Sequence, residues 1–376
     1  MQLMKGRSTN KDAESAVQEA TAAFETTPEI LFVFSSTTQN AADVTSAIAK
    51  RFPGVPVAGC TTAGEQLGAV HANGSLVVMG VADSEVAWSV RQVQNLEAQD
   101  SESLTATTAA MFDEVDLAPE EVDPNQAVCM LFIDGLRGLE ERICSDLADA
   151  LEGIPLAGGS AGDDLKFEET RVFGPDGALT NAATLVVARS TDGTPIRVLK
   201  HQHFTSTPTS LVVTRVEGRT VHEFDGYPAT EAYAAALGVK PEELSSDLSF
   251  LNPVTFACNG EIYVRSVQAI HDDGSITFYC AVEEGMVLEL GGHKDMCEAL
   301  DQDLHTGFAD KPELVVGFNC ILRALEASGK ELHESLGEIY DSEIPGLVGF
   351  DTYGEQLNGL HINQTLVAVG FGRAAD

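Results

Sequence analysis

The chain has 376 residues, of which 44% are hydrophobic, and carries 22 basic against 58 acidic side chains for a formal net charge of −36. This charge opposes binding to nucleic-acid phosphates and to anionic lipid surfaces, so we expect neither as a partner. The hydrophobic content supports a large core in about two domains, and no apolar run approaches the roughly 18 residues that cross a bilayer. The polar residues 1–15 do not resemble a secretory signal, so we expect a cytoplasmic protein without membrane insertion.

Helices and strands are expected to alternate in the first part of the chain. In order, hydrophobic periodicity predicts a helix at 12–24, a strand at 31–35, a helix at 40–52 and strands at 55–60 and 75–81. A strand, a helix and a strand with short connections form a βαβ unit, whose strands pair in parallel. The glycine turn after Cys60 then lies at the carboxyl end of its strand, where ligands of open α/β sheets gather.

The later part of the chain adds antiparallel elements. In order, we expect a loosely helical acidic stretch at 100–125, a polar, turn-rich domain boundary at 190–209, a strand at 211–216, a helix at 229–237, an antiparallel hairpin at 261–282 and a helix at 294–305. The prediction is an α/β protein of two domains, built from repeated βαβ-type units, with mixed sheets and an antiparallel hairpin in the second domain.

An internal repeat is the strongest pattern in the sequence. Residues Gly59–Gly80 recur as Gly349–Gly370, with eleven identities in twenty-two positions, where about one or two are expected by chance. In a looser third copy Met130–Ile133 matches Leu31–Phe34 at an offset of 99, which also relates the glycine turns. Where the outer copies share Gly-x-x-Thr-x-Gly-Glu, this copy has Gly-Gly-Ser-Ala-Gly-Asp-Asp, so we expect its role to have diverged.

Short motifs in a fixed order extend beyond the repeat. They are Gly59 to Glu65; Asp225, Gly226, Pro228, Ala229, Tyr233 and Gly238; Leu251 to Pro253; Tyr263 to Ser266; Glu284 and Gly285; Cys320 and Arg323; and Gly349 to Glu355. With these motifs the chain resembles the FIST proteins, a family of bacterial and archaeal intracellular sensory proteins, over nearly all of 30–370. The resemblance implies a FIST N-terminal domain at 25–200 and a FIST C-terminal domain at 210–372. It also implies signal transduction through a small ligand, with amino acids proposed; some members bind haem, respond to nitric oxide and regulate histidine kinases.

The two glycine turns supply the first candidate ligand-binding residues. Successive amides between glycines can form an anion-binding concavity, the Thr hydroxyl can donate or accept, and the Glu offers acceptors to an amine. This chemistry fits an amino acid, which carries both a carboxylate and an amine. The alternative is structural: the glycines satisfy a tight turn and the Glu caps the neighbouring copy. The candidates are Gly59, Thr62, Gly64 and Glu65, and Gly349, Thr352, Gly354 and Glu355.

Two arginines beside apolar runs are further candidates. Arg265 follows 262–264 and Arg323 follows 317–322, so each is expected near a strand end, where a guanidinium can hold a carboxylate bidentately. A surface salt bridge is the alternative in a chain with surplus acid. Cys320, in the same motif as Arg323, completes the candidate set.

Haem or metal binding is an open alternative. His71 and His361 occupy matched positions of the repeat, and we expect each to form a hydrogen bond within its loop. His201 and His203 lie in the polar boundary and are expected to be solvated. We single out no histidine as a haem or metal ligand, since the sequence shows no pocket around any of them.

A thiol enzyme is a second alternative. The seven cysteines lack paired spacing, which favours free thiols. Cys60 and Cys320 end apolar runs, where a nucleophile can face a pocket. No nucleophile elbow, phosphate loop or metal-ligand spacing is present, so we expect no enzyme.

These patterns together predict a sensor. A small ligand would bind in a cleft lined by the glycine loops, bridge two copies and shift the population toward a closed arrangement. The sequence contains no kinase, cyclase or DNA-binding segment, so we expect the signal to pass to a separate protein, such as a histidine kinase.

Overall fold

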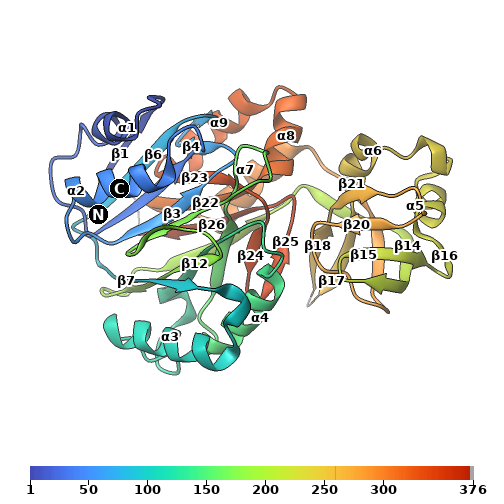
Figure 1. The fold of residues 1–376 in the computed structure, drawn as a ribbon, viewed down its shortest axis with the longest axis horizontal. Coiled ribbons are helices and arrows are strands. Elements are labelled where there is room, and N and C mark those ends of the chain that lie inside the picture. The colour runs from blue at the N-terminus through green and yellow to red at the C-terminus, as the bar shows by residue number, and fades with distance from the viewer. Residues whose placement is uncertain (259, 373–376) are drawn as a thin grey trace. The chain divides into compact units, whose positions relative to one another are not determined.

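Figure 1 shows the fold of a computed structural model, which describes residues 1–258 and 260–372. The described chain divides into two compact units that are discontinuous in sequence. Unit 1 holds 1–201, 300–360 and 366–372, and unit 2 holds 361–365 and the described part of 202–299. The predicted α/β class, with two parts and mixed sheets, is confirmed.

Unit 1 contains three copies of one element order: a strand, a helix, a strand, one or two helices, a strand, a hairpin and a last strand. Copy 1 consists of β1 (Gln2–Ser8), α1 (Ala13–Ala20), β2 (Ile30–Ser35), α2 (Ala41–Arg51), β3 (Val57–Thr61), β4 (Glu65–Leu67), β5 (Val70–Ala72) and β6 (Leu76–Ala82). Copy 2 consists of β7 (Val86–Gln94), α3 (Ser101–Glu114), β8 (Ala127–Ile133), α4 (Glu140–Ala150), β9 (Leu156–Ser160), β10 (Val172–Gly174), β11 (Gly177–Leu179) and β12 (Ala182–Ser190). Copy 3 consists of β13 (Ile196–His201), α7 (Met296–Gly307), β22 (Leu314–Cys320), α8 (Ile321–Gly329), α9 (His333–Glu343), β23 (Leu347–Thr352), β24 (Glu355–Leu357), β25 (Leu360–Ile362) and β26 (Leu366–Phe371). The chain of unit 2 is thus inserted mainly between β13 and α7.

Each copy supplies four strands of one six-stranded sheet. The strand orders are β1-β6-β2-β3-β10-β11, β7-β12-β8-β9-β24-β25 and β13-β26-β22-β23-β4-β5. The pairs β2–β3, β8–β9 and β22–β23 are parallel, as the βαβ units predict. Each sheet is mixed because it also contains antiparallel pairs, such as β1–β6 and β3–β10 in the first sheet, β8–β12 in the second, and β13–β26 and β23–β4 in the third.

The hairpins are exchanged among the copies in a closed cycle. Hairpin β10–β11 of copy 2 pairs with β3 of copy 1, β4–β5 of copy 1 pairs with β23 of copy 3, and β24 of copy 3 pairs with β9 of copy 2. The registers are equivalent: Gly59 lies opposite Phe173, Gly349 opposite Gln66, and Gly158 opposite Gln356. Each sheet of unit 1 therefore depends on a strand of a second copy.

Glycines allow close packing where strands and copies meet. A Cβ on Gly59 would lie 1.8 Å from the carbonyl oxygen of Val33, and the φ of Gly59 is +153°. Between the copies, the Phe350 ring centroid lies 4.9 Å from that of Phe34 and 6.2 Å from that of Phe132. A Cβ on Gly159 would lie 3.1 Å from the Phe350 ring, so glycine in copy 2 makes room for this ring.

The strand registers correct one part of the repeat alignment. Phe34 lies opposite Cys60, and Phe132 lies opposite Gly159. Because Cys60 and Gly159 are equivalent in the glycine turns, Phe132 matches Phe34 at an offset of 98. The offset of 99 predicted for Met130–Ile133 is wrong by one residue. Both apolar runs are buried throughout, so no polar position marked the shift.

Helix α2 illustrates how the local sequence sets the helices. Asn40 Oδ1 accepts hydrogen bonds from the backbone N–H groups of Ala42 (3.0 Å) and Asp43 (3.1 Å) and so caps the first turn. Val44 and Ile48 lie four residues apart on one face and are buried in the core of copy 1.

Unit 2 is an antiparallel β unit with two short helices. Its elements are β14 (Phe204–Glu217), β15 (Thr220–Phe224), β16 (Tyr227–Pro228), α5 (Ala229–Leu237), α6 (Ser246–Leu251), β17 (Val254–Cys258), β18 (Glu261–Arg265), β19 (Val267–Ile270), β20 (Ile276–Phe278) and β21 (Val287–His293). The strand order is β18-β17-β21-β14-β15-β20-β19, with β16 beside β15. The predicted hairpin is confirmed, since β19 and β20 pair in antiparallel fashion, and α5 has the predicted bounds. Tyr233 of α5 is buried with Phe224 and Phe278 in the core of this unit.

Two segments that were not predicted as strands pair in sheets. Residues 2–8 form β1, which pairs with β6, and the stretch at 190–209 that we predicted to be irregular contains β13 and the beginning of β14. The compact units divide inside this stretch, after His201. His201 and His203 are buried and not solvated as expected, and His201 Nδ1 lies 2.8 Å from Asp303 Oδ2. Pairing with distant strands overrides the weak local preference of these polar segments.

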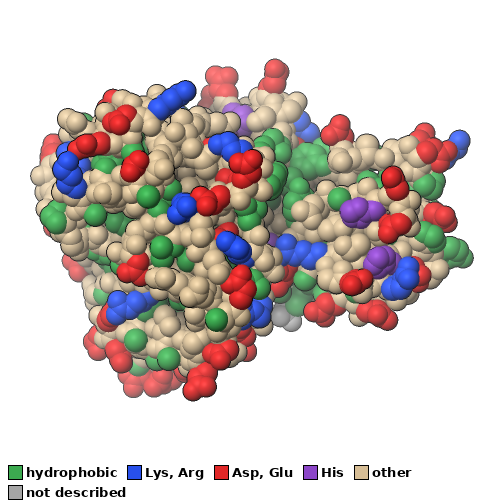
Figure 2. Space-filling model, viewed as in Figure 1, with side chains coloured by type: hydrophobic (Ala, Val, Ile, Leu, Met, Phe, Trp, Pro, Cys, Tyr) green, Lys and Arg blue, Asp and Glu red, His purple; other side chains and the backbone are tan. Residues whose placement is uncertain are grey.

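The surface on the side shown in Figure 2 carries acidic side chains spread over many elements, with fewer basic ones among them. This pattern matches the net charge of −36. In the described part of the chain, no helix has the length and apolar character needed to cross a membrane.

Candidate functional site

The glycine turn of copy 1 is closed by its own side chains. Thr62 Oγ1 donates to Glu65 Oε1 (2.5 Å), and the backbone N–H (2.9 Å) and Oγ (2.7 Å) of Ser75 donate to Glu65 Oε2. Burial raises the pKa of Glu65 to about 7, although the bonds from Ser75 and Thr62 act in the opposite direction. The Thr–Glu pair therefore ties the turn to the start of β6.

The glycine turn of copy 3 repeats this arrangement. Thr352 Oγ1 donates to Glu355 Oε1 (2.5 Å) and accepts from the N–H of Gly354 (3.2 Å), and all three residues are buried. Gly349 lies in β23, where a Cβ would meet the carbonyl oxygen of Gly317 at 2.4 Å. These contacts are internal to the copy, so a ligand role for either turn stays a prediction.

Arg265 belongs to unit 2, whereas both turns belong to unit 1. Its Nε donates to the carbonyl oxygen of Ala281 (3.0 Å), its Nη1 donates to that of His361 (3.3 Å), and its guanidinium lies 4.4 Å from the ring centroid of Phe256. These contacts hold a buried guanidinium within the unit.

Arg323 is the candidate whose hydrogen bonds are incomplete. It lies in the first turn of α8, after the buried Cys320 at the N-cap, and its side chain is 1% exposed. Nη1 donates to Asn319 Oδ1 (2.6 Å) and to Tyr340 Oη (3.1 Å), whereas Nε and Nη2 have no partner among the described groups. Arginine stays protonated in proteins, and a buried charged donor without an acceptor is costly.

A small cavity lies beside this guanidinium. Its volume is about 10 Å³, close to the minimum that one water molecule needs. It lies between the hairpin of copy 1 and helices α8 and α9 of copy 3. Its polar lining consists of Gln66 and His71 of copy 1 and Asn319, Arg323, His333 and Tyr340 of copy 3.

A polar chain links the two copies at the cavity. His71 Nε2 lies 2.6 Å from Asp351 Oδ2, and Asn319 Nδ2 donates to Asp351 Oδ1 (2.7 Å). The rings of His71 and His333 stack with centroids 4.4 Å apart and an interplanar angle of 8°. Burial on its own lowers the pKa of His71, but the charge and hydrogen bond of Asp351 outweigh it, and the net shift is upward.

The glycine of the copy 1 turn permits this approach. A Cβ on Gly64 would lie 2.3 Å from Asp351 Oδ2, so any other residue would displace the carboxylate. The expected hydrogen bond of His71 within its own loop is wrong, because the partner belongs to copy 3.

The sequence identified Arg323 as a candidate but not the residues around it. Asp351, inside the repeated turn, stands where copy 1 has Thr61, and this charge difference was the available signal. His333 and Tyr340 lie outside the repeat, so only the three-dimensional packing of α9 reveals them.

Residues 29–227 match the FIST N domain, and residues 229–358 match the FIST C domain. The chain belongs to the FIST family. FIST domains are associated with signal transduction and small-ligand sensing. No curated protein sequence matches this chain.

The FIST segments do not coincide with the compact units. The FIST N segment covers most of copy 1, copy 2, β13 and the beginning of unit 2, while the FIST C segment covers the rest of unit 2 and most of copy 3. The bounds of 25–200 for the FIST N-terminal domain and 210–372 for the FIST C-terminal domain stay a prediction. The candidate cavity takes its walls from both FIST segments, because its hairpin and its helices belong to different ones.

The other two copy junctions of this FIST protein lack the charged set. Counting from the paired strands, Arg323 corresponds to Arg137 in copy 2 and Gln39 in copy 1. Arg137 has a side chain that is 41% exposed and pairs with Asp134 at 3.3 Å. Gln39 donates to the carbonyl oxygen of Asn10 (2.8 Å). Among these three positions, only Arg323 is a buried guanidinium with unsatisfied donors.

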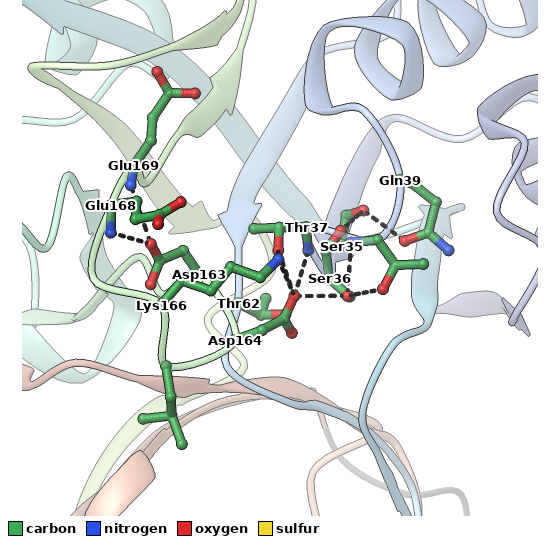
Figure 3. A network of polar contacts seen from close by, with 12 residues as sticks. Ser35, Ser36, Thr37, Gln39, Thr62, Asp163, Asp164, Lys166, Glu168 and Glu169 are labelled. Atoms are coloured by element: carbon green, nitrogen blue, oxygen red, sulfur yellow. Dashed lines mark hydrogen bonds and ion pairs between the residues drawn. The ribbon is translucent and has the colours of Figure 1, made fainter.

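In a second polar network of the FIST protein, the carboxylates of Asp163 and Asp164 both accept hydrogen bonds from the protein. Figure 3 shows Asp164 of copy 2 directed at the loop after β2, where Asp164 Oδ2 accepts from Ser36 Oγ (3.0 Å) and from the N–H of Thr37 (2.9 Å). Asp163 Oδ2 accepts from the N–H groups of Glu168 (2.7 Å) and Glu169 (3.0 Å). The diverged Asp-Asp of copy 2 thus holds loops together.

Haem does not fit the candidate cavity as the structure presents it. A cavity of about 10 Å³ is far below the roughly 300–1,000 Å³ of typical cofactor sites. Nε2 of His71 is engaged by Asp351, and Nε2 of His333 lies 2.7 Å from Ser328 Oγ. Within the described residues, no group of three or more side chains suited to holding a metal ion is found.

Proposed function

We propose that this FIST protein is a cytoplasmic sensor that binds a small ligand in the cavity beside Arg323 and signals to a separate protein. The observation that supports this is the buried guanidinium with two unsatisfied donors. A fold selected for stability alone gains nothing from such a group, whereas a ligand acceptor would satisfy it.

The free edge of Arg323 defines the part of the ligand that binds there. Nε and Nη2 present parallel N–H groups on one side of the guanidinium, the geometry that takes a carboxylate bidentately. An amino acid fits this requirement through its carboxylate. Glu65 and Glu355, which the sequence offered to the amine, are engaged with Thr62 and Thr352.

The proposed signal is a population shift within unit 1. A ligand in the cavity contacts the copy 1 hairpin and helices α8 and α9 together, so it stabilises the conformation in which these elements are correctly placed. A ligand larger than a water molecule requires the turn between α8 and α9 to move outward. The position of this turn is what a partner, such as a histidine kinase, would detect.

We propose a binding role and no catalysis. Burial raises the pKa of the Cys60 thiol well above its ordinary value and so disfavours the nucleophilic thiolate. Cys60 also packs inside β3, where copies 2 and 3 carry Gly159 and Phe350. A thiol enzyme would lose turnover on Cys60→Ser or Cys320→Ser.

A ligand screen tests the proposal. Amino acids and small carboxylates are added to the full chain, and the melting temperature is recorded, since a ligand that binds only the folded state raises it. Arg323→Gln should abolish the response, while the control Arg137→Gln, at the equivalent position of copy 2, should retain it. A response that survives Arg323→Gln or Arg323→Ala unchanged contradicts the proposed site.

The haem alternative has its own test. The absorption spectrum is recorded after expression with sufficient iron, and again after addition of haem and nitric oxide. A stoichiometric Soret band that shifts with nitric oxide would replace the small-metabolite proposal. A protein that stays colourless supports it.

A further inference from the structure

The charges around the cavity constrain what can bind there. Arg323 contributes a fixed positive charge and Asp351 a negative one, and Asn319 connects the two through its hydrogen bonds. A bound anion would make the site more negative. The titratable groups that face the cavity or its histidine pair are Arg323 of α8, Tyr340 and His333 of α9, Asp351 of β23, Glu65 of β4 and His71 of β5.

The two stacked histidines are not equivalent. His71 contacts Asp351, and the net effect raises the pKa of His71. For His333, burial, the charge of His71 and that of Arg323 lower the pKa, while the charge of Asp351 opposes them. His333 is partly exposed and begins α9, so it can exchange a proton with solvent.

An anion beside Arg323 would favour the protonated form of His333. It would offset the positive charges of Arg323 and His71, which disfavour protonation of the neighbouring ring only 4.4 Å away from His71. Binding of the anion and binding of a proton should therefore strengthen each other by the same factor.

We infer that the cavity binds a small carboxylate or a similar oxyanion at Nε and Nη2 of Arg323, and that His333 takes up a proton from solvent as the anion binds. This inference rests on the proposed function, because it names the ligand class and adds a proton at the same site. No covalent bond changes: one anion and one proton enter together, and the charge of the site is conserved.

Formate is the appropriate probe, since it is the smallest carboxylate and so requires the least outward movement of the turn between α8 and α9 beside the small cavity. Its affinity is measured by thermal shift from pH 5.5 to 8, with sodium chloride at equal ionic strength as the control. We expect formate to stabilise the protein more than chloride does. Its affinity should fall by about tenfold in total as His333 loses its proton, because linkage makes this factor equal to a pKa rise of about one unit on binding.

Ring NMR of His333 measures the proton directly. In the full chain, saturating formate should raise the pKa of His333 by about one unit. His333→Gln should still bind formate but with an affinity that no longer depends on pH. A formate affinity independent of pH in the wild type, or a His333 pKa that formate leaves unchanged, would overturn the proton uptake.

Variants of Arg323 separate the inference from the proposed function. Arg323→Gln should weaken formate binding by about 10- to 100-fold, the value of a charge-assisted hydrogen bond, and Arg137→Gln should leave it unchanged. Should Arg323→Gln fail to fold, Arg323→Lys keeps the charge and loses the bidentate edge. Binding that depends on Arg323 but not on pH overturns the inference and leaves the proposed function standing. Stabilisation by neither formate nor any carboxylate in the screen overturns both, and equal stabilisation by chloride overturns the carboxylate class.

Discussion

Two junctions between copies share a strand register but differ in their polar side chains. In the first, the copy 1 hairpin meets copy 3; in the second, the copy 3 hairpin meets copy 2. Gln66 lies opposite Gly349 in the first, and Gln356 lies opposite Gly158 in the second. Where the first has Asp351 bonded to His71 and Asn319, the second has Ser160, whose Oγ accepts from Gln356 Nε2 (2.8 Å).

This difference shows that the charged groups are not needed to build the junction. The second junction keeps the register of the hairpin with the neutral Gln356–Ser160 hydrogen bond at the place where the first has Asp351. A buried ionic set that the architecture does not require is costly, because desolvation of the charges must be offset. We therefore attribute the extra groups of the first junction to the ligand role proposed for Arg323.

The largest loss of stability is expected for a change in the backbone packing that the copies share. Gly59→Ala should cost at least about 4 kcal/mol of the free energy of unfolding, because the new Cβ overlaps the carbonyl oxygen of Val33 and the φ of +153° is strained. Denaturant unfolding measures this. Gly329→Ala is the control, since a Cβ there meets nothing within 4 Å, and it should be neutral or slightly stabilising. Near-native stability of Gly59→Ala would refute this account of the strand packing.

The buried Glu65 should give a somewhat smaller, pH-dependent effect, at a position where copy 2 has Val172. As its pKa is raised from 4.5 to about 7, the unfolded chain loses the proton first, and stability falls as the pH rises between these values. The total loss is about 3 kcal/mol, from about 1.4 kcal/mol per pKa unit. Glu65→Gln should flatten the profile measured by chemical denaturation at several pH values, and the exposed Glu338→Gln should not. A profile that keeps its slope in Glu65→Gln would assign it to another group.

Asp351→Asn should remove the charge that distinguishes the first junction. The raised pKa of His71 contributes stability that is complete below its unfolded value near 6.5 and is lost as the pH rises through the folded pKa. We therefore expect a loss of about 2 kcal/mol near pH 6, and less at pH 8. NMR should show a lower His71 pKa in the variant, whereas the exposed Asp341→Asn should leave it unchanged. An unaltered His71 pKa would mean that another group holds its proton.

Arg323→Met should have the smallest effect on stability. The variant loses the bonds to Asn319 and Tyr340 but also removes a desolvated charge with two unsatisfied donors, so the net change should stay within about 1 kcal/mol. Calorimetric unfolding measures the change, with Arg137→Met as the matched control. A loss above about 3 kcal/mol would show that Arg323 is a structural residue.

The sequence was most informative where one local pattern decides the structure. The repeated turn predicted equivalent architecture at both ends of the chain, and helix 229–237 was located correctly because its apolar period and Gly238 define both ends. Arg323 was also selected from its position after an apolar run. Each of these features depends on residues close together in sequence.

The missed features depend on partners distant in sequence. Nothing in 65–72 indicates that this hairpin pairs with β23, because antiparallel edges of similar composition are interchangeable by pattern alone. For the same reason the loop partner of His71 was predicted wrongly, and β13 was not recognised as a strand. Polar residues acquire their roles here from the exchange of hairpins.

The closed exchange of hairpins also determines the order in which the chain can fold during synthesis. Hairpin β4–β5 leaves the ribosome among the first elements, but its partner β23 is made only after copy 2 and nearly all of unit 2. Until then this hairpin has an unpaired edge, whereas β3 waits only for β10 of copy 2, and unpaired edges are sites of wrong pairing. Completion of the third sheet requires a contact between distant segments, and such contacts slow folding. The cavity beside Arg323, which has walls from the earliest and the latest parts of the chain, is therefore among the last features to form. Under the proposed function, a nascent chain would respond to ligand only once its fold is complete.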